Sequence, residues 1–147
     1  FNFDGRKHLL EYDDVLNKHR EIIYKKRKEF LNAVDVRGAI LEMAEKSGKD
    51  MEAFKRELEI RQQELGEQQM KQLEKMVCLK IVDTLWQEHL SYMDHVRDSV
   101  KLRSYAGRDP LVEYKSEGHK AFSQLLATLD NTIAENILKA ELEELPQ

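Results

Sequence analysis

Few residues of this sequence have the type and spacing that catalysis or metal binding requires. Glu88 and His89 are neighbours, as are Asp94 and His95. Such pairs of carboxylate and imidazole can hold a metal ion. Their spacing differs from the HExxH pattern, in which two imidazoles lie one helical turn apart. We therefore interpret both pairs as ordinary polar residues on a helix surface.

Three other candidates for chemistry are equally weak. Asp13 and Asp14 could form a carboxylate pair for general acid–base catalysis. Adjacent helical residues point about 100° apart, so we interpret them as solvated or structural carboxylates. Cys78 lies between two apolar residues, which is typical of a small core residue. The glycines are scattered and form neither GxxxxGK nor GxGxxG, so no phosphate-binding loop is indicated.

Residues 103–110 form the one candidate binding site that the residues indicate. Arg103 and Arg108 contribute to a local excess of positive charge in an acidic chain. Basic side chains near a helix C-terminus interact favourably with the helix dipole, which is the simpler explanation. The segment also places Tyr105 between two predicted helices, and an aromatic ring with a polar end can contact varied partners at low entropic cost. Composition alone leaves both explanations open.

The composition of the whole chain limits the fold and the classes of function. Its 147 residues include 24 Lys and Arg against 28 Asp and Glu, and the net charge of −4 argues against a nucleic-acid-binding protein. Six glycines and two prolines are too few for the turns of a many-stranded sandwich or barrel. The single cysteine excludes an internal disulfide and is typical of a reducing compartment.

The ends and the hydropathy of the chain give further expectations. No apolar run approaches the roughly 18 residues that a membrane span needs. The chain begins with Phe1, and no signal peptide is visible behind it. We therefore expect it to be a piece of a longer protein.

Apolar residues recur at helical spacing along most of the chain, so we predict an all-α fold. The first helix is predicted at about residues 5–31. Its apolar stripe consists of Leu9, Tyr12, Leu16, His19, Ile23 and Phe30 and is widened by Leu10, Val15 and Ile22. A linker is predicted at residues 46–50, and Asp50 can cap the helix that follows.

The second half is predicted to form an antiparallel two-helix hairpin. Residues 59–75 are mostly charged or amide side chains, and we interpret them as a solvent-exposed strut with a bend at Gly66. Gly107 suits a left-handed helix end, and Asp109 before Pro110 is a typical helix start. Because two helices that meet at a short loop fold back on each other, we expect a hairpin at about residues 76–138, packed on the long first helix.

Three stretches of the sequence resemble the SecA family, the motor ATPases of bacterial preprotein translocation. Residues 2–17 (NFDGRKHLLEYDDVLN) resemble the start of the family's helical scaffold domain. Residues 85–90 (LWQEHL) resemble the first helix of its two-helix finger. Residues 103–118 (RSYAGRDPLVEYKSEG) are similar to the finger loop and the second finger helix.

The resemblance implies a role that periodicity alone cannot give. SecA proteins push unfolded preproteins through the SecY channel, and their scaffold helix packs against the motor domains. The finger enters the cytoplasmic funnel of SecY, where a tip tyrosine contacts the moving polypeptide. That position matches Tyr105, while Arg103 and Arg108 would orient the tip or meet acidic groups of the channel. The resemblance implies a cytoplasmic location, with peripheral association to the plasma membrane through the channel.

Several parts of the family pattern have no counterpart in the sequence. Without the nucleotide-binding domains we expect no ATP hydrolysis by this chain alone and no cofactor in it, since ATP and Mg²⁺ would belong to the parent protein. Without the family's zinc-binding tail we expect no metal. Relatives also carry a longer helical wing at about residues 44–62. We therefore predict a first scaffold part at residues 1–45, a shortened wing and linker at 46–69, and a second scaffold part with the finger at 70–147.

A different class of function stays open, namely a freestanding helical or coiled-coil adaptor without a motor. This alternative predicts a stable homodimer through the first apolar stripe and no affinity for SecY. Analytical ultracentrifugation and a SecY pull-down would distinguish the two. An apolar stripe without its neighbour can also seek a second copy, so the sequence leaves self-association of the isolated chain open.

Overall fold

The computed structural model describes the backbone of residues 2–140 and the side chains of residues 9–104 and 106–140. In chain order the elements are α1 (Asn2–Asn32), α2 (Arg37–Lys46), α3 (Met51–Leu65), α4 (Glu67–Arg103), the 3-10 turn η1 (Ser104–Ala106) and α5 (Pro110–Asn136). No strand occurs in this described part, and the predicted all-α fold is confirmed.

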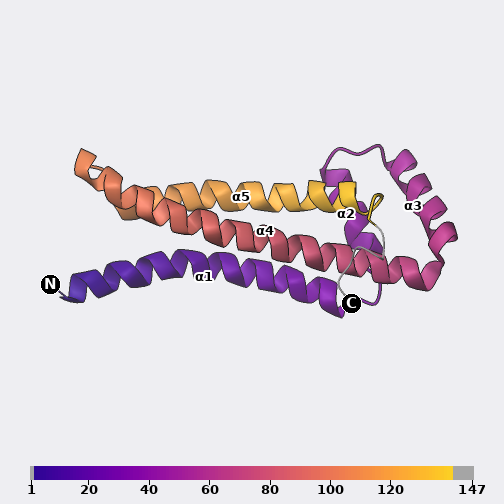
Figure 1. Cartoon of the computed structure of the whole chain (residues 1–147), viewed down its shortest axis with the longest axis horizontal. Coiled ribbons are helices and arrows are strands. Elements are labelled where there is room, and N and C mark those ends of the chain that lie inside the picture. Colours follow the sequence, from indigo (N-terminus) through magenta and orange to yellow (C-terminus); the bar gives the residue numbers. More distant parts are fainter. Residues whose placement is uncertain (1, 141–147) are drawn as a thin grey trace.

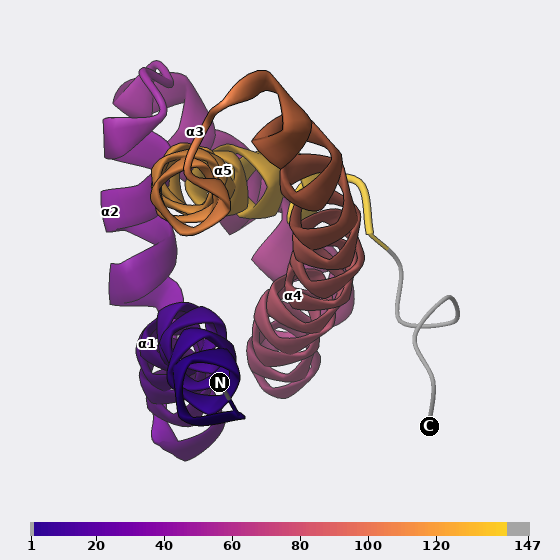
Figure 2. The ribbon, with the colours of Figure 1, turned by 90° about the vertical axis from the view of Figure 1, so that its left-hand side faces the viewer.

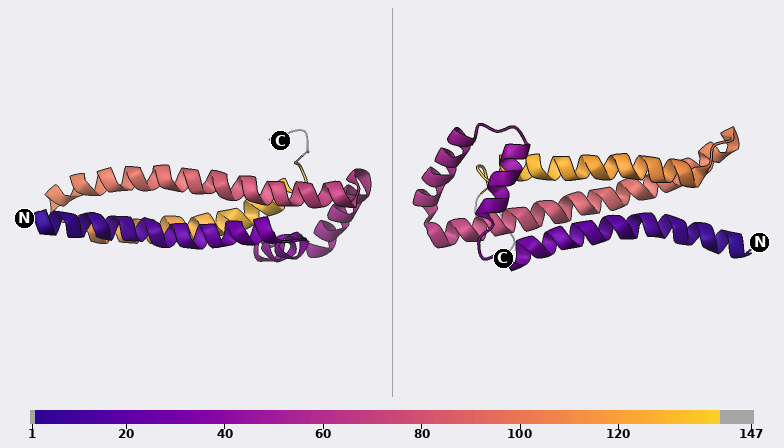
Figure 3. Two further views of the ribbon diagram at one scale, coloured as in Figure 1. Left: turned by 90° about the horizontal axis from the view of Figure 1, so that it is seen from below. Right: turned by 180° about the vertical axis from the view of Figure 1, so that it is seen from behind.

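Three long helices run side by side and give the molecule an elongated shape (Figure 1). Helices α4 and α5 form the antiparallel hairpin, and α1 lies along it in the direction of α5. Viewed from the end, α1, α4 and α5 lie at the corners of a triangle (Figure 2). The short helices α2 and α3 lie at the end opposite the hairpin loop in both views of Figure 3. The predicted packing of a long helix on a hairpin is confirmed.

The ends of the helices explain where the hairpin reverses. Gly107 has a φ of +81°, in the left-handed region that glycine adopts without strain. Oδ1 of Asp109 accepts hydrogen bonds from the backbone N–H groups of Leu111, at 2.9 Å, and Val112, at 3.4 Å. Pro110 is the first residue of α5. Asp50 caps α3 in the same way, so both predicted caps are confirmed.

The break at Gly66 divides what the sequence pattern predicts as one bent helix. Gly66 has a φ of +91° and a ψ of 152°, a conformation that ends α3 and starts α4 at the same residue. Residues with a Cβ atom rarely adopt this conformation. As a result α3 meets the start of α4 at a steep angle and packs against it (Figure 1).

The interpretation of residues 59–75 as a solvent-exposed strut holds for most of the segment but is wrong for one side of it. Met70, Leu73 and Glu74 are fully buried there. Because α3 packs against the start of α4, and α2 and α5 also pack at this end, the start of α4 is covered on several sides. The charged residues of this segment occupy the remaining, exposed side.

Two hydrophobic clusters hold the bundle together. The tip cluster, near the hairpin loop, consists of Tyr12, Met93, Val96, Val100 and Tyr114. The base cluster fills the other end and draws on all five helices. It consists of Ile23, Phe30, Val36, Ile40, Met43, Ala44, Phe54, Leu58, Met70, Leu73, Val77, Cys78, Val82, Trp86, Phe122, Leu125, Leu129, Ile133, Ala134 and Ile137.

The apolar stripe of α1 is narrower than the sequence predicts. Tyr12, Ile23 and Phe30 are buried against the hairpin as expected. Residues Leu10 and Ile22, which should widen the stripe, are exposed. The hairpin covers only one side of α1 (Figure 2), which leaves room for such side chains to stay exposed.

No helix in the described part of the chain combines the length and the apolar character that crossing a membrane demands.

Gly118 on α5 lets the three long helices approach closely. A Cβ atom there would lie 2.8 Å from Cε of Met93 and 3.6 Å from Cγ1 of Val15. We expect Gly118→Val to lower the free energy of unfolding by about 1–3 kcal/mol, because its branched side chain overpacks this contact. Gly118→Ala is the control, since a gain of about 1 kcal/mol in helix propensity offsets a shift of the flexible Met93 methyl. Urea denaturation checks both, and a valine variant as stable as the native chain would contradict the close approach.

Candidate functional site

The candidate site is the tip of the hairpin, where α4, η1 and α5 meet. It lies at the end of the molecule farthest from α2 and α3 (Figure 1). Tyr105 is the middle residue of η1. Its side chain lies outside the described part of the structure, so its contact role stays a prediction.

Arg103, in the last turn of α4, ties the two arms of the hairpin together. Its Nη1 donates hydrogen bonds to Oε2 of Glu113, at 2.7 Å, and to Oε1 of Glu117. Its Nη2 and Nε donate to Oγ of Ser99. The hydrogen bonds that Arg103 donates to Glu117 and Glu113 raise its pKa. The guanidinium is therefore engaged within the hairpin, an arrangement suited to orienting the tip.

Arg108 is held more loosely than Arg103. Its Nη1 lies 3.5 Å from Oε1 of Glu113, and 63% of its side chain is exposed. Lys101 is exposed as well. Lys101 and Arg108 are thus exposed basic side chains at the tip that a partner can reach.

Two apolar residues at the tip escaped the sequence analysis. Leu102 is 71% exposed and Val112 is 62% exposed, one on each side of the loop. Both lie outside the apolar stripes of their helices. This position off the stripe is the sequence feature from which their exposure could have been predicted. The tip therefore combines exposed apolar side chains with exposed positive charge.

Helix α1 supports the hairpin just behind the tip. The rings of Tyr12 on α1 and Tyr114 on α5 meet edge to face, with centroids 4.8 Å apart. The guanidinium of Arg97 on α4 lies 5.1 Å from the centre of the Tyr12 ring and 4.0 Å from Oδ1 of Asp13. Burial raises the pKa of Tyr114 to about 12, so its hydroxyl stays protonated. The side chain of Arg97 is thus engaged in the contact between α1 and the hairpin.

A second surface lies on the outer side of α1, in a hollow of about 630 Å³ between α1 and α4. Arg20, Tyr24, Lys28 and Leu31 line it from α1. Tyr24 and Leu31 are large exposed apolar side chains. The part of this surface that α1 contributes therefore combines exposed apolar side chains with basic ones.

The remaining residues that the sequence offered as candidates for catalysis or metal binding have structural roles. Asp14 pairs with Lys18 at 3.6 Å on the surface of α1. Cys78 is buried, and burial raises the pKa of its thiol to about 12. Among the side chains that the structure describes, no group of three or more His, Cys, Asp and Glu is placed to hold a metal ion.

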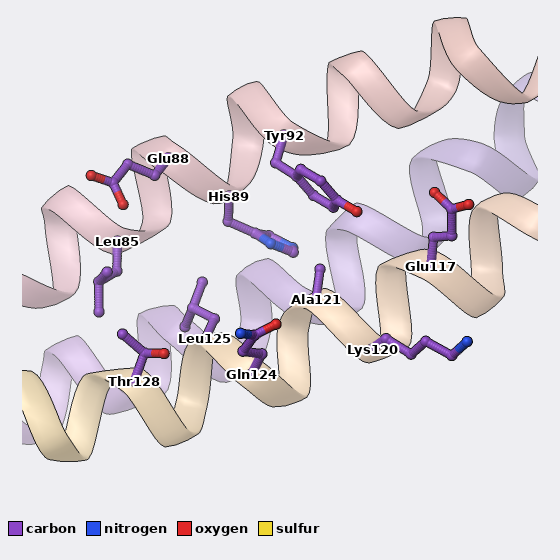
Figure 4. A pocket seen from close by; sticks show the side chains of 10 residues that line it. All are labelled: Leu85, Glu88, His89, Tyr92, Glu117, Lys120, Ala121, Gln124, Leu125 and Thr128. Atoms are coloured by element: carbon purple, nitrogen blue, oxygen red, sulfur yellow. The ribbon is translucent and has the colours of Figure 1, made fainter.

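The interpretation of His89 as a surface residue is wrong. It is buried, and its Nε2 lies 3.0 Å from Nδ1 of His19. The imidazole extends from α4 toward α5 at the floor of a hollow (Figure 4). Periodicity places His19 in the apolar stripe of α1, but it cannot indicate which residue of α4 faces it.

Comparison with known proteins identifies close sequence relationships. The sequence profile of the SecA Wing and Scaffold domain matches residues 1–53 and 47–141. The protein translocase subunit SecA of Pelotomaculum thermopropionicum is 30% identical over 192 aligned positions, which cover 96% of this chain and 22% of that protein. The SecA subunit of one Dehalococcoides mccartyi strain is 31% identical over 95% of the chain and 20% of the relative.

The chain therefore spans about a fifth of the length of these curated relatives. The 192 positions aligned with the first relative exceed the 147 residues of the chain, so part of the matched segment of that relative has no counterpart here.

Proposed function

Since this chain belongs to the SecA wing and scaffold domain family, we propose that it forms the scaffold and the two-helix finger of a protein translocase. In this role α1 is a rigid strut, and the α4–α5 hairpin transmits the motion of motor domains to its tip. The tip contacts an unfolded preprotein inside the SecY channel. Family membership favours this role over that of a freestanding adaptor.

The observation that carries the proposal is a hairpin whose two arms are joined by side-chain contacts and whose tip exposes apolar and basic side chains. Arg103 joins the two arms through Glu113 and Glu117. Behind it, Tyr12 of α1 packs against Tyr114 of α5. A hairpin held in this way moves as one body, so a displacement at its base reaches its tip.

The chemistry of the tip suits a partner without a fixed sequence. Apolar surface and positive charge are both non-directional in their attraction. The exposed side chains of Leu102, Val112, Lys101 and Arg108 supply the two together. Tyr105 would add an aromatic contact that tolerates many side chains of the passing polypeptide.

The outer face of α1 is the proposed docking surface for the motor domains of the parent protein. Arg20 and Lys28 would meet acidic side chains there, and Tyr24 and Leu31 would lose their exposure to water. The motor domains would bind ATP and Mg²⁺, while this chain supplies the mechanical connection. The proposal places the chain on the cytoplasmic side of the plasma membrane, attached through SecY.

A cross-linking experiment in the complete translocase tests this function. A photoreactive amino acid at position 105 is expected to give adducts with a preprotein that is stalled in the channel. The matched control has the same group at Tyr92, an exposed tyrosine on α4 away from the tip. Adducts at position 92 but not at 105 would contradict the proposal.

A further inference from the structure

Two histidines from distant parts of the chain meet inside the bundle. Nδ1 of His19 on α1 lies 3.0 Å from Nε2 of His89 on α4. The two side chains are only 9% and 4% exposed. Phe122 of α5 stacks on His19, with ring centroids 4.2 Å apart and an interplanar angle of 1°. Because Phe122 belongs to α5, the pair connects all three long helices. The ring centroids of Trp86 and His89, both on α4, lie 5.7 Å apart.

The pair lies where the two hydrophobic clusters meet. Along α1, His19 stands between Tyr12 of the tip cluster and Ile23 of the base cluster. Along α4, His89 stands between Trp86 of the base cluster and Met93 of the tip cluster. The pair therefore occupies the middle of the contact between α1 and the hairpin.

The hydrogen bond between the rings depends on their protonation. In the neutral pair one nitrogen donates its N–H and the other accepts with a lone pair. A first added proton gives a charge-assisted bond, but it brings a full charge among aromatic rings. A second proton turns both facing nitrogens into donors, which cannot bond to each other. The packed arrangement therefore fits the neutral pair.

The charged neighbours of the pair do not compensate for added protons. His119 of α5 lowers the pKa of His19 further, so it opposes protonation of that ring. Glu88 and Tyr92 of α4, with Glu117 and Lys120 of α5, line the hollow that also contains His89 (Figure 4). Among the described residues no carboxylate forms an ion pair or a hydrogen bond with either ring.

The other polar links between α1 and α4 are ion pairs at the surface. Arg27 donates to Asp83 at 2.7 Å, and Arg97 lies 4.0 Å from Asp13. Solvent screens such exposed pairs, so their contribution is small. The buried histidines are thus the polar contact between these helices that is most sensitive to a change of charge.

We infer that the His19–His89 pair is a pH-sensitive latch, which holds α1 against the α4–α5 hairpin while both rings are neutral and releases α1 when they take up protons. This inference rests on the packing of the pair and does not depend on the proposed role in translocation.

The direction of the pH dependence follows from the burial of the rings. Burial lowers the pKa of His19, with a further contribution from His119. Burial also lowers the pKa of His89 to about 4, with a further contribution from His19. Unfolded or released, both rings return toward the ordinary value of 6.5. The latch therefore contributes fully above pH 6.5, and its contribution is lost as the pH falls from there toward 4.

The single tryptophan of the chain provides a direct readout. A protonated imidazole in contact with an indole ring quenches its fluorescence, and release of α1 would expose Trp86 to water. We expect the emission of the native chain to weaken and shift to the red between pH 6.5 and 4. Over the same range, the unfolding equilibrium constant should rise by up to about tenfold per pH unit for each histidine that takes up a proton.

The double substitution His19→Gln with His89→Gln keeps hydrogen-bonding side chains that do not titrate. It should remove most of both changes, whereas His95→Gln, at an exposed histidine on the same helix, should retain them. A double variant with the pH response of the native chain would overturn the inference. If the double variant does not fold, NMR titration of the native imidazoles decides: a pKa at or above 6.5 for both rings would overturn the latch equally.

Discussion

Replacement of Tyr105 by alanine in the complete translocase is expected to slow polypeptide translocation by at least about tenfold. Truncation of a central aromatic contact typically costs about 2 kcal/mol, which corresponds to roughly a thirtyfold weaker grip. The turn that contains Tyr105 is set by Gly107 and by the Asp109 cap. The variant should therefore fold with little loss of stability. In vitro translocation of a purified preprotein measures the effect.

Two matched variants separate a loss of grip from general damage to the hairpin. Tyr105→Phe keeps the ring and should retain most of the activity. Tyr92→Ala removes an exposed tyrosine from α4 and should have little effect. Translocation at the native rate by Tyr105→Ala would refute the gripping role. An equal loss in Tyr92→Ala would show that the tip has no special part in it.

The second large effect is expected at Arg37, which joins three helices at the base of the bundle. Its Nε donates to Oε2 of Glu74 at 2.5 Å, and its Nη2 donates to Oε1 of Gln62 at 2.8 Å. Glu74 is only 1% exposed. Arg37→Met leaves this carboxylate buried without its partner, and such a loss typically costs about 3–5 kcal/mol. Urea denaturation at pH 7 measures the change in the free energy of unfolding.

The pH dependence of this variant shows whether its loss of stability comes from the unpaired charge of Glu74 or from lost packing of the Arg37 side chain. Burial raises the pKa of Glu74, while the hydrogen bond from Arg37 opposes that rise. Without Arg37 the folded chain binds a proton at Glu74 more readily than the unfolded chain does, so acidification toward pH 5 should reduce the difference in stability between the variant and the native chain at the same pH. Adding Glu74→Gln should relieve the defect at pH 7. A loss that neither change relieves would contradict the role of the buried charge.

The features that the sequence predicted correctly are those with a local cause. The Asp109 and Asp50 caps and the left-handed Gly107 depend on residues within one turn of the chain. The hairpin follows from the short loop between two apolar stripes. The exposed outer part of the first stripe had no such local signal, because Leu10 and Ile22 are as apolar as the residues that are buried.

The features that the sequence missed depend on pairing between distant residues. His19 and His89 are 70 positions apart, and Arg37 and Glu74 are 37 apart. Periodicity gives the face of a helix on which a residue lies, but it does not give the partner of that face. Gly66 is a related case, because a single glycine in a helical pattern is compatible with a slight bend or with a sharp break between two helices. The proposed domain boundaries and the contact role of Tyr105 remain predictions.

The unequal sizes of the two hydrophobic clusters have a mechanical consequence. The hairpin resembles a cantilever. Its base packs against residues of α1, α2 and α3 in the base cluster, whereas near its free end Tyr12 is the buried residue that α1 contributes to the tip cluster. A force applied at the loop acts there with its longest lever arm. The contact between Tyr12 and Tyr114 should therefore separate before the contacts of the base cluster do. The loop end of the hairpin can then move away from α1 and return while the base cluster stays packed.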